Sequence, residues 1–483
     1  MANKVQLLIG GKAVAAIEGK TFTRENPISG QVVTHAAAAT VVDAVAAVTA
    51  GVAAQATWGA LGPNERRTQL LAAVQRLTEA GPELIRLMIE ETGASRPWAE
   101  FNLRLACSML RDAASMTTQL TGEVIASDRP GVLSMAVREP HGTVLSIAPW
   151  NAPIILCVRA FAMPLACGNT VVLKASEMCP ATHCKIGEIV AEGLPAGALN
   201  VLTHSAEDAS ALVSALIEHP KVRHVNFTGS SGVGRIIAEK AGANLKPVLL
   251  ELGGKSPLIV LDDADLDEAV NAAAFGAFMH SGQICMATER IVVQEAVADE
   301  FARRLARKAA SLPAGDPGKK PVVLGALISS KAADKTEALI ADAVAKGAKR
   351  LCGGWREGPM MDATVLDHVT PAMRIYTEET FGPAVPIVRV KNDDEAVHVA
   401  NDTEYGLSAA VYTSDIARGL RIARRIESGI CHVNGPTIQD EAQVPFGGVK
   451  ASGIGRFGGR YGIDAFTNLR WLSIETQHPH YPF

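Results

Sequence analysis

The sequence predicts a protein of the α/β class, with two domains that are built on mostly parallel β-sheets. Apolar strand patterns alternate with helical patterns from about residue 142 to residue 251. This alternation is typical of parallel strands that are joined by crossover helices. A second alternating stretch begins at residue 256. The length of 483 residues also exceeds what one hydrophobic core normally serves, so two or three domains are expected.

The region before the first alternating stretch divides into a hairpin and a helical part. The run VQLLI-GG-KAVAAI at residues 5–17 predicts a β-hairpin, because a Gly-Gly pair suits a two-residue turn. Residues 42–120 have apolar side chains at helical spacing with charged residues between them, which predicts helices. The most apolar run, residues 144–158, contains two prolines and an asparagine, so we expect no membrane-spanning segment. The N-terminus lacks the long apolar run of a secretory signal.

Strands and helices of the two alternating stretches can be assigned in order. In the first stretch we expect strands at residues 142–149, 169–176, 198–203, 222–228 and 246–252, and helices at 153–168, 180–193, 206–219 and 231–242. In the second we expect strands at 256–261, 290–295 and 384–390, a helix after Asp265, and helices at 298–312 and 393–402. Two further strand patterns, at 132–140 and 468–476, have no strand neighbours in the sequence.

Composition and charge narrow the functional classes. Hydrophobic residues make up 48% and charged residues 20%, which is the balance of an ordinary globular protein. The formal net charge of −4 argues against a nucleic-acid partner, which would favour a basic face. None of the eight cysteines forms a C-x-x-C pair or a repeated cluster with histidine. We therefore expect reduced thiols, no bound metal and a cytoplasmic location.

The motif VNFTGSSGVG at residues 225–234 indicates a phosphate-binding turn. A strand ends before Gly229 and Ser230, and a helix then continues through Gly234. Backbone N–H groups at a helix start bind phosphate oxygens well. The motif is weak alone, because strand, glycine turn and helix follow one another in many α/β proteins.

The motif VVLKASE strengthens the nucleotide interpretation. Lys174 and Glu177 lie at the end of an apolar strand, which is where ligands bind in open α/β sheets. A carboxylate there can accept hydrogen bonds from ribose hydroxyls, and it would repel a 2′-phosphate, which favours NAD over NADP. A solvated ion pair would explain either residue alone. The two motifs together favour a nucleotide.

Two polar residues interrupt apolar runs and allow two interpretations each. Glu251 ends the strand run LLE before two glycines. It is either an acid or base with a raised pKa, or a carboxylate that caps nearby N–H groups, because a buried unpaired carboxylate is costly. Asn151 precedes the expected helix in APWNAP. It is either an N-cap or an amide that donates to an oxyanion.

The loop GQICMATER at residues 282–290 raises the same question for Cys285. A lone cysteine is most often a small buried hydrophobe. A loop that contains glycine and glutamine, between a helix and a strand, instead predicts an exposed thiol, as a nucleophile requires. Six of the other cysteines lie in apolar helix or strand patterns, and Cys179 lies in a loop beside Pro180 without polar neighbours.

The motifs taken together resemble those of one family. APWNAP, VVLKASE, NFTGSSGVG, LELGGKSP, GQICMATER, EETFGP and PFGGVKASGIGR occur in the order and spacing of the aldehyde dehydrogenase superfamily, over nearly the whole chain. The resemblance implies a Rossmann-type NAD domain, an α/β catalytic domain and a small β oligomerisation flap. On this pattern residues 1–121 and 141–251 would form the NAD-binding domain, 252–450 the catalytic domain, and 122–140 and 466–483 the oligomerisation segments.

The resemblance also implies roles for individual residues. Cys285 would be the nucleophile, Asn151 and the Cys285 backbone N–H the oxyanion hole, and Glu251 the general base. The residues expected to bind NAD are Trp150, Lys174, Glu177, Gly229, Ser230, Gly234, Glu379 and Phe381. Where many relatives have a glutamate, this chain has Phe457, so a proton relay through that position is in doubt.

The implied reaction is NAD-dependent oxidation of an aldehyde to the carboxylic acid, through a thiohemiacetal and a thioester on Cys285. Relatives that transfer the acyl group to coenzyme A usually lack the base, so Glu251 favours hydrolysis to the free acid. Two other classes are a thiol esterase and a non-catalytic structural protein. The nucleotide motifs count against the first class, and the intact set of Asn151, Glu251 and Cys285 counts against the second.

The resemblance is strongest to the bacterial salicylaldehyde, vanillin and benzaldehyde dehydrogenase branch, so an aromatic aldehyde is expected. An aliphatic aldehyde or a semialdehyde is the alternative. Ala152 leaves room for a flat ring, and Arg159, Trp98 and Ile438 are expected to line the substrate pocket. Arg159 either meets a ring hydroxyl or pairs with a structural carboxylate. A homodimer or homotetramer is expected, because the two isolated strands would not remain unpaired.

Overall fold

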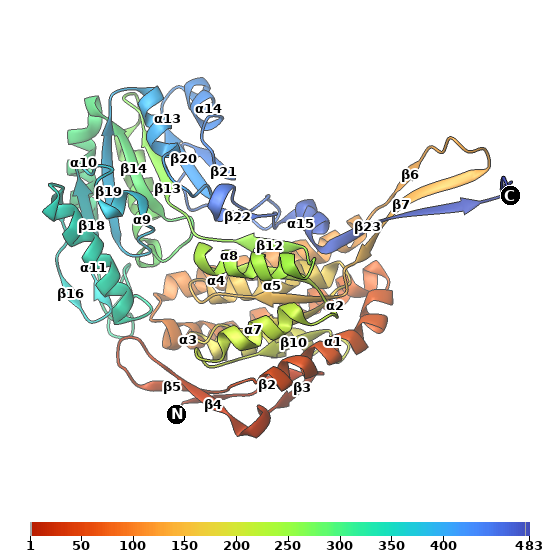
Figure 1. Ribbon diagram of the computed structural model, residues 1–483. Helices are drawn as coiled ribbons and strands as arrows, with labels where there is room; N and C mark the ends of the chain where they lie inside the picture. The colour runs from red at the N-terminus through yellow and green to blue at the C-terminus, as the bar shows by residue number, and fades with distance from the viewer. Residues whose placement is uncertain (1, 479) are drawn as a thin grey trace.

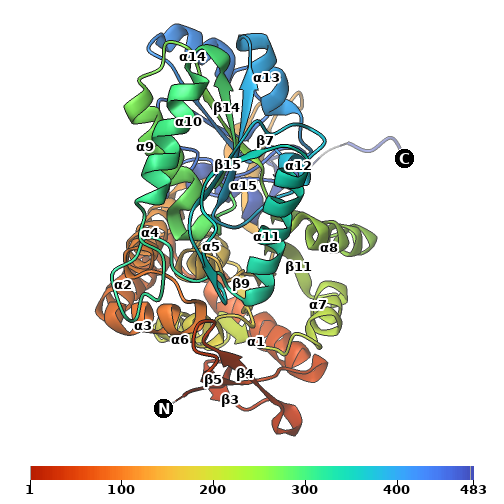
Figure 2. The same cartoon turned by 90° about the vertical axis from the view of Figure 1, so that its left-hand side faces the viewer.

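Two large, mostly parallel β-sheets organise the chain, and a small antiparallel sheet projects from one side (Figure 1). The computed structural model describes residues 2–478 and 480–483. Helices cover both faces of each large sheet, as Figure 2 shows from the side. The predicted α/β class with two parallel sheets is therefore confirmed.

The first sheet has eight strands, and the central ones run parallel. In spatial order they are β22 (Gly453–Ile454), β12 (Val248–Glu251), β11 (Val222–Thr228), β8 (Thr143–Ile147), β9 (Thr170–Lys174), β10 (Leu199–Leu202), β2 (Leu7–Ile9) and β3 (Lys12–Val14). β2 and β3 form the predicted hairpin. Gly10 and Gly11 at its turn have φ of 60° and 75°, which such a turn requires.

The helices of this half form two cores, one on each face of the first sheet. One core includes apolar residues of α1 (Val41–Ala60), α7 (Ala209–Glu218) and α8 (Ser231–Ala243). The other includes α2 (Pro63–Glu79), α3 (Gly81–Thr92), α4 (Arg96–Met116), α5 (Pro153–Ala166) and α6 (Pro180–Ala191). By length and composition α1 could cross a membrane. One side of it packs on β9, β10 and α7, as in a core helix.

The second sheet has seven strands, and only β15 at one edge runs antiparallel to its neighbour. In spatial order they are β15 (Lys349–Cys352), β18 (Thr364–Asp367), β19 (Ala384–Val390), β14 (Thr288–Gln294), β13 (Ser256–Val260), β20 (Ser408–Tyr412) and β21 (Ile430–Val433). One face is covered by α9 (Leu266–Phe278) and α10 (Glu295–Ala310). The other face is covered by α11 (Ser330–Ala345), α12 (Arg374–Thr377), α13 (Asp393–Asn401) and α14 (Ile416–Ala423).

The two strands without sequence neighbours pair with each other. β7 (Val132–Pro140) and β23 (Thr467–Glu475) form an antiparallel ladder along their full length, and β6 (Glu123–Ile125) adds a third strand. This sheet, called the flap below, extends away from the rest of the molecule next to α15 (Gly459–Phe466) (Figure 1). The pairing lies within one chain, so unpaired strands are no longer a reason to expect an oligomer.

Several smaller elements were not predicted from the sequence. A three-stranded sheet near the N-terminus contains β1 (Asn3–Val5), β5 (Val32–Ala37) and β4 (Thr21–Glu25), and a short ladder joins β16 (Arg356–Glu357) to β17 (Met360–Met361). β14 begins at Thr288, two residues before the expected strand. The division of the chain at residue 251 falls between β12 and β13, which belong to different sheets, while the assignment of domains stays a prediction.

Candidate active site

Two cavities meet at Cys285. A cavity of about 270 Å³ contains Trp150, Glu251, Glu379 and Phe381 in its wall. A second cavity of about 420 Å³ is mostly apolar. Five residues belong to both walls, namely Asn151, Leu156, Arg159, Cys285 and Phe446. A thiol in this position can react with a molecule in one cavity while a second molecule occupies the other.

The loop before Cys285 has an unusual backbone. α9 ends at Phe278, and His280, Ser281 and Gly282 follow with φ of 50°, 55° and 74°. Left-handed conformations are costly for residues other than glycine, so the surrounding contacts must hold this loop. Gln283 provides them, because its amide donates to the carbonyls of His280 and Ala326 and accepts from the Ile328 N–H at 2.9 Å.

The Cys285 thiol is less exposed than the loop sequence suggested. The residue is half-buried, although it reaches both cavities. Burial raises its pKa to about 12, and the nearby Glu251 charge acts in the same direction. The Arg159 guanidinium acts in the opposite direction on the pKa of this thiol. The nucleophile therefore needs a nearby base or cation to ionise near neutral pH.

Asn151 is not the N-cap of α5. The cap position is Ala152, which makes no side-chain cap, so that interpretation of the sequence is wrong. The Asn151 amide instead donates to the Gln283 carbonyl at 3.0 Å, two residues before Cys285. Its backbone carbonyl accepts from Trp98 Nε1 at 3.2 Å. An amide donor therefore lies beside the thiol, in a position that suits an oxyanion.

Glu251 is the last residue of β12, and its side chain is buried with 2% exposure. In the described part of the chain neither carboxylate oxygen has a hydrogen-bond partner, so the capping interpretation is wrong. Burial raises the pKa of Glu251 well above its usual value, while the Arg159 and Arg456 charges oppose this. A carboxylate with a raised pKa and free oxygens can act as a general acid or base.

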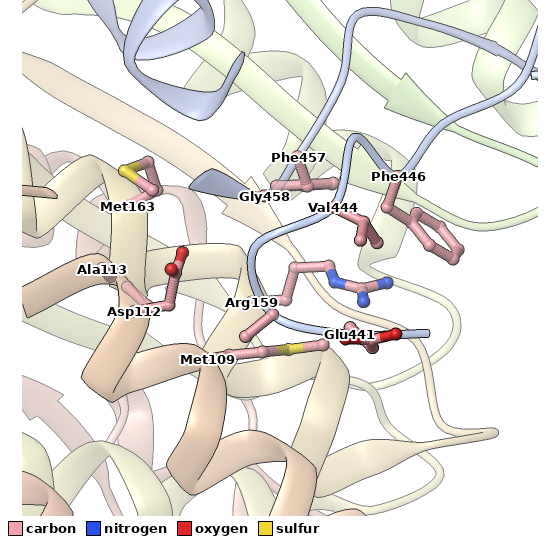
Figure 3. Close-up of a pocket in the computed structure, with 12 residues that line it drawn as sticks. Met109, Asp112, Ala113, Arg159, Met163, Glu441, Val444, Phe446, Phe457 and Gly458 are labelled. Atoms are coloured by element: carbon pink, nitrogen blue, oxygen red, sulfur yellow. The ribbon is translucent and has the colours of Figure 1, made fainter. Parts of the chain in front are cut away.

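Arg159 of α5 has a carboxylate partner that the sequence analysis did not identify. Its guanidinium forms an ion pair with Asp440, and the two side chains are 7% and 8% exposed. It also lies over the Phe446 ring at 4.2 Å and near the Phe457 ring at 5.7 Å. A narrow third cavity of about 30 Å³ reaches the same arginine (Figure 3). The structure thus supplies the structural partner that was one of the two expectations for Arg159.

The predicted phosphate turn lies between β11 and α8. Ser230 is the N-cap of α8, and its hydroxyl accepts from the Val233 N–H at 3.4 Å. A Cβ on Gly229 would approach the Phe227 ring to 2.4 Å, and a Cβ on Gly234 would approach Leu252 to 2.5 Å. A side chain at either position would displace its neighbour, so glycine allows the turn to pack closely on the sheet. Gly229 and Ser230 line the 270 Å³ cavity.

Lys174 and Glu177 lie together at the end of β9, with Lys174 Nζ 3.8 Å from the Glu177 carboxylate. They are not among the lining residues of the two cavities at Cys285. His204, which the sequence analysis missed, faces the same carboxylate at 3.9 Å. Burial lowers the pKa of His204 to about 4, so this imidazole is neutral near pH 7. No sequence signal would have indicated it, because it follows a different strand.

Glu379 and Phe381 line the 270 Å³ cavity on the side of the second sheet. The Phe381 ring meets the Trp150 ring edge-on, with 5.8 Å between the ring centres. Glu379 Oε1 accepts from the Gly254 N–H at 2.9 Å. Burial, followed by repulsion from Glu289, raises the pKa of Glu379 to about 7. Lys335 of α11 also lines this cavity and was not predicted from the sequence.

The 420 Å³ cavity is lined largely by aromatic and aliphatic side chains. Trp98 and Ile438 belong to its wall, as do Phe101 and Phe275. Trp98 stacks with Phe101 and with His280, with ring centres 5.4 Å and 5.1 Å from that of Trp98. Stacked rings hold a flat apolar wall, which suits a flat apolar ligand. Within residues 2–478 and 480–483 no group of three or more His, Cys, Asp or Glu side chains is arranged to hold a metal ion.

A parallel-sheet protein with a cavity beside a glycine turn and a second, apolar cavity is typical of the class of nucleotide-dependent enzymes. The particular family follows from comparison with known proteins. Residues 14–472 match the model of the aldehyde dehydrogenase family, and the chain belongs to that family. It is an enzyme of the oxidoreductase class, which confirms the resemblance seen in the sequence motifs.

Three similar proteins illustrate the relationship. A vanillin dehydrogenase of Pseudomonas fluorescens is 54% identical over 479 residues, which is 99% of each chain. A benzaldehyde dehydrogenase [NAD(+)] of Pseudomonas putida is 39% identical over 461 residues, covering 95% of this chain and 94% of the relative. The crystal structure of a salicylaldehyde dehydrogenase from Pseudomonas putida G7 complexed with salicylaldehyde is 48% identical, covers 100% of both chains and superposes with a TM-score of 0.98.

Proposed function

We propose that this protein oxidises aromatic aldehydes to carboxylic acids, with NAD as the electron acceptor. The observation that supports this most directly is the position of Cys285 at the junction of a cavity that suits a nucleotide and a cavity that suits a flat ring. The similar vanillin, salicylaldehyde and benzaldehyde dehydrogenases point to the same substrate class.

The residues around the 270 Å³ cavity fit NAD. The N-terminus of α8 would present backbone N–H groups and a partial positive charge to a pyrophosphate. A Cβ on Gly253 would approach the Glu379 carboxylate to 2.8 Å. Glycine at position 253 therefore leaves room for this carboxylate in the cavity wall. Glu379 in this wall would accept from the nicotinamide ribose. Glu177, at the end of β9 and outside this wall, would accept from the adenosine ribose. NAD, when bound, accepts two electrons and the hydrogen of the aldehyde carbon.

The chain's own residues would perform the other steps. The Cys285 sulfur bonds to the aldehyde carbon, its proton passes to a base, and the Asn151 amide and the Cys285 N–H stabilise the oxyanion. Oxidation of this adduct leaves a thioester on Cys285. Glu251 then takes a proton from water as the water attacks the thioester, and cleavage of the carbon–sulfur bond releases the acid and regenerates the thiol.

The apolar cavity favours an aromatic aldehyde over a short aliphatic one. A flat ring can lie against Trp98 and fill the space beside Ala152, whereas a short chain would leave apolar wall uncovered. Cys285 belongs to the wall of this cavity, so the aldehyde group of a ring inside it could reach the sulfur. Ile438 lies in the same wall.

We also propose a homodimer or homotetramer and a cytoplasmic location. The flap supports the first proposal, because it projects from the chain and exposes Leu469 and Trp471. Exposed apolar side chains on a projecting sheet are typical of a contact surface between subunits. The reduced state expected for the eight cysteines supports the second proposal.

The test is NADH formation with vanillin, salicylaldehyde, benzaldehyde and propionaldehyde, each compared by kcat/KM. We expect the three aromatic aldehydes to exceed propionaldehyde. Cys285→Ala should abolish NADH formation while NAD binding, measured by calorimetry, stays nearly unchanged. A folded wild-type protein that forms no NADH from any of the four would refute the proposal, and a preference for propionaldehyde would refute its aromatic part.

A further inference from the structure

Two buried charges form a network that the reaction described above does not use. Lys255, just before β13, and Glu289, in β14, are almost completely shielded from solvent, and Lys255 Nζ lies 2.7 Å from Glu289 Oε2. Burying an ion pair costs free energy unless further hydrogen bonds satisfy both partners. The other hydrogen bonds of Lys255 and Glu289 therefore indicate which segment of the chain this ion pair stabilises.

Those hydrogen bonds lead to the segment that contains Glu379 and Phe381. Glu289 Oε2 accepts from the Thr380 N–H at 2.9 Å, and Oε1 accepts from the Phe381 N–H at 2.9 Å. Lys255 Nζ also contacts the Thr380 hydroxyl at 3.2 Å. One carboxylate therefore satisfies two consecutive backbone amides of the cofactor-cavity wall.

The segment held in this way has a strained backbone. Phe381 has φ of 52°, a conformation that a phenylalanine adopts only when its surroundings impose it. Its neighbour Glu379 accepts from the Gly254 N–H, the residue before Lys255. Glu289 is four residues after Cys285, and Lys255 is four residues after Glu251. The network thus connects the segments that follow Glu251 and Cys285 to residues 379–381, of which Glu379 and Phe381 line the part of the cavity proposed to bind the nicotinamide ribose.

We propose that Glu289, braced by Lys255, is a positioning residue that holds residues 379–381 in the shape that binds NAD. The inference rests on the NAD role of Glu379 proposed above. Glu289 acts through the Thr380 and Phe381 amides and touches neither substrate nor cofactor. Its side chain is absent from the walls of both cavities at Cys285, which agrees with an indirect role.

The charge of Glu289 has a second effect on the same segment. Glu379 faces Glu289, Lys335 and Lys255, and its charge is also felt by Cys285 and Tyr405. Its pKa is raised to about 7, first by burial and then by Glu289. The ionised form accepts from ribose hydroxyls, so NAD affinity should be full above pH 7 and should fall as Glu379 becomes protonated below it.

The test is direct NAD binding by calorimetry from pH 5.5 to pH 9. For the wild type we expect affinity to fall below about pH 7, by up to tenfold per pH unit. In Glu289→Gln one amide acceptor becomes a donor that faces backbone N–H groups, so NAD should bind about tenfold more weakly at pH 8.5. Because a negative neighbour is lost, the pH at which affinity falls should also move lower.

Two further variants separate this role from a general structural one. Lys335→Met removes a positive neighbour of Glu379 from an exposed side chain and should move the same transition to higher pH. Glu91→Gln is the matched control, because Glu91 is also a buried carboxylate that accepts from two backbone amides, those of Ala181 and Thr182. It should leave the pH of the transition unchanged.

The outcomes are distinct. Unchanged affinity in Glu289→Gln, or weaker binding with an unmoved transition, would overturn the proposal. A wild type that binds no NAD would instead refute the proposed function. If Glu289→Gln does not fold, the double variant Lys255→Met/Glu289→Gln removes both buried charges and permits the same measurement. In the double variant too, we expect NAD affinity to fall at a lower pH than in the wild type. The reason is that Glu289 raises the pKa of Glu379 more than Lys255 lowers it.

Discussion

At the residue scale, the candidate site combines groups whose charged forms are all disfavoured by burial. The pKa of Cys285 is raised to about 12, and that of Glu251 is raised well above its usual range. The charges of Arg159 and Arg456 oppose the rise in the pKa of Glu251, and Arg159 is already paired with Asp440. The thiol and the carboxyl are thus not expected to be ionised together, because the charge of Glu251 raises the pKa of Cys285 further.

Glu251→Gln should stop the reaction at the thioester. The amide keeps the shape of the side chain but cannot take a proton from water. We expect a burst of about one NADH per active site and then slow turnover, which is typical of a trapped covalent intermediate. Rapid mixing followed by absorbance at the NADH band measures both phases. Equal loss of the burst and the steady rate would show that Glu251 acts earlier, on the thiol.

Arg159→Ala separates the two roles considered for this arginine. Removal of one partner leaves Asp440 buried and unpaired, so we expect a loss of stability of about 3–5 kcal/mol, measured by denaturant unfolding. If the arginine only pairs with Asp440, kcat/KM should fall alike for salicylaldehyde, benzaldehyde and propionaldehyde. A selective loss for salicylaldehyde would show that Arg159 also contacts the ring hydroxyl.

At the element scale, the candidate site is built from the ends of parallel strands. Lys174 ends β9, Thr228 ends β11 and Glu251 ends β12. β8, β9, β11 and β12 run parallel, so their carboxyl ends meet at one edge of the sheet. This arrangement explains why Thr228 and Glu251 line one cavity, while Lys174 lies at the same edge of the sheet outside the wall of that cavity.

The end of β9 sets the expected preference between NAD and NADP. Glu177 would place a negative charge near a 2′-phosphate, and the neutral His204 would not offset it. We expect kcat/KM to be higher with NAD than with NADP in the wild type. Glu177→Gln should lower the ratio of these two constants by about tenfold, or ~1.4 kcal/mol. Measured constants that favour NADP in the wild type would contradict this interpretation.

At the scale of the whole molecule, the flap is the part of a single chain that leaves an edge strand and apolar side chains exposed. β23 is an edge strand, and Leu469 and Trp471 on it are 66% and 72% exposed. Long exposed edge strands promote association with another chain. The flap strands contribute no residue to the wall of either cavity at Cys285, so association of the flap should not affect the chemistry directly.

Light scattering at micromolar concentration should therefore show a dimer or a tetramer. Leu469→Glu places a charge on the exposed face without disturbing a buried contact, and we expect it to lower the mass of the assembly. The exposed Leu351→Glu, on the edge strand β15 of the second sheet, is the control and should leave the mass unchanged. A monomeric wild type would contradict the proposal.

The sequence by itself determined the α/β class, the order of most strands and helices, and the family. These features depend on local information, because a strand repeats every two residues, a helix every 3.6, and glycine and proline mark the turns. The start of α5 at Pro153 and the Gly10–Gly11 turn are of this kind. The loop position of Cys285 and the strand-end position of Glu251 could be predicted for the same reason.

Only the tertiary structure decided how these residues meet. Asp440 pairs with Arg159 across 281 positions of sequence, and Asn151 reaches Gln283 across 132. The Asn151 amide therefore faces the thiol loop and not its own helix, and Cys285 is more buried than its loop suggested. Spacing along the chain cannot reveal such contacts, because they depend on how two separately formed sheets and their loops pack together, and that packing is decided by the whole buried surface.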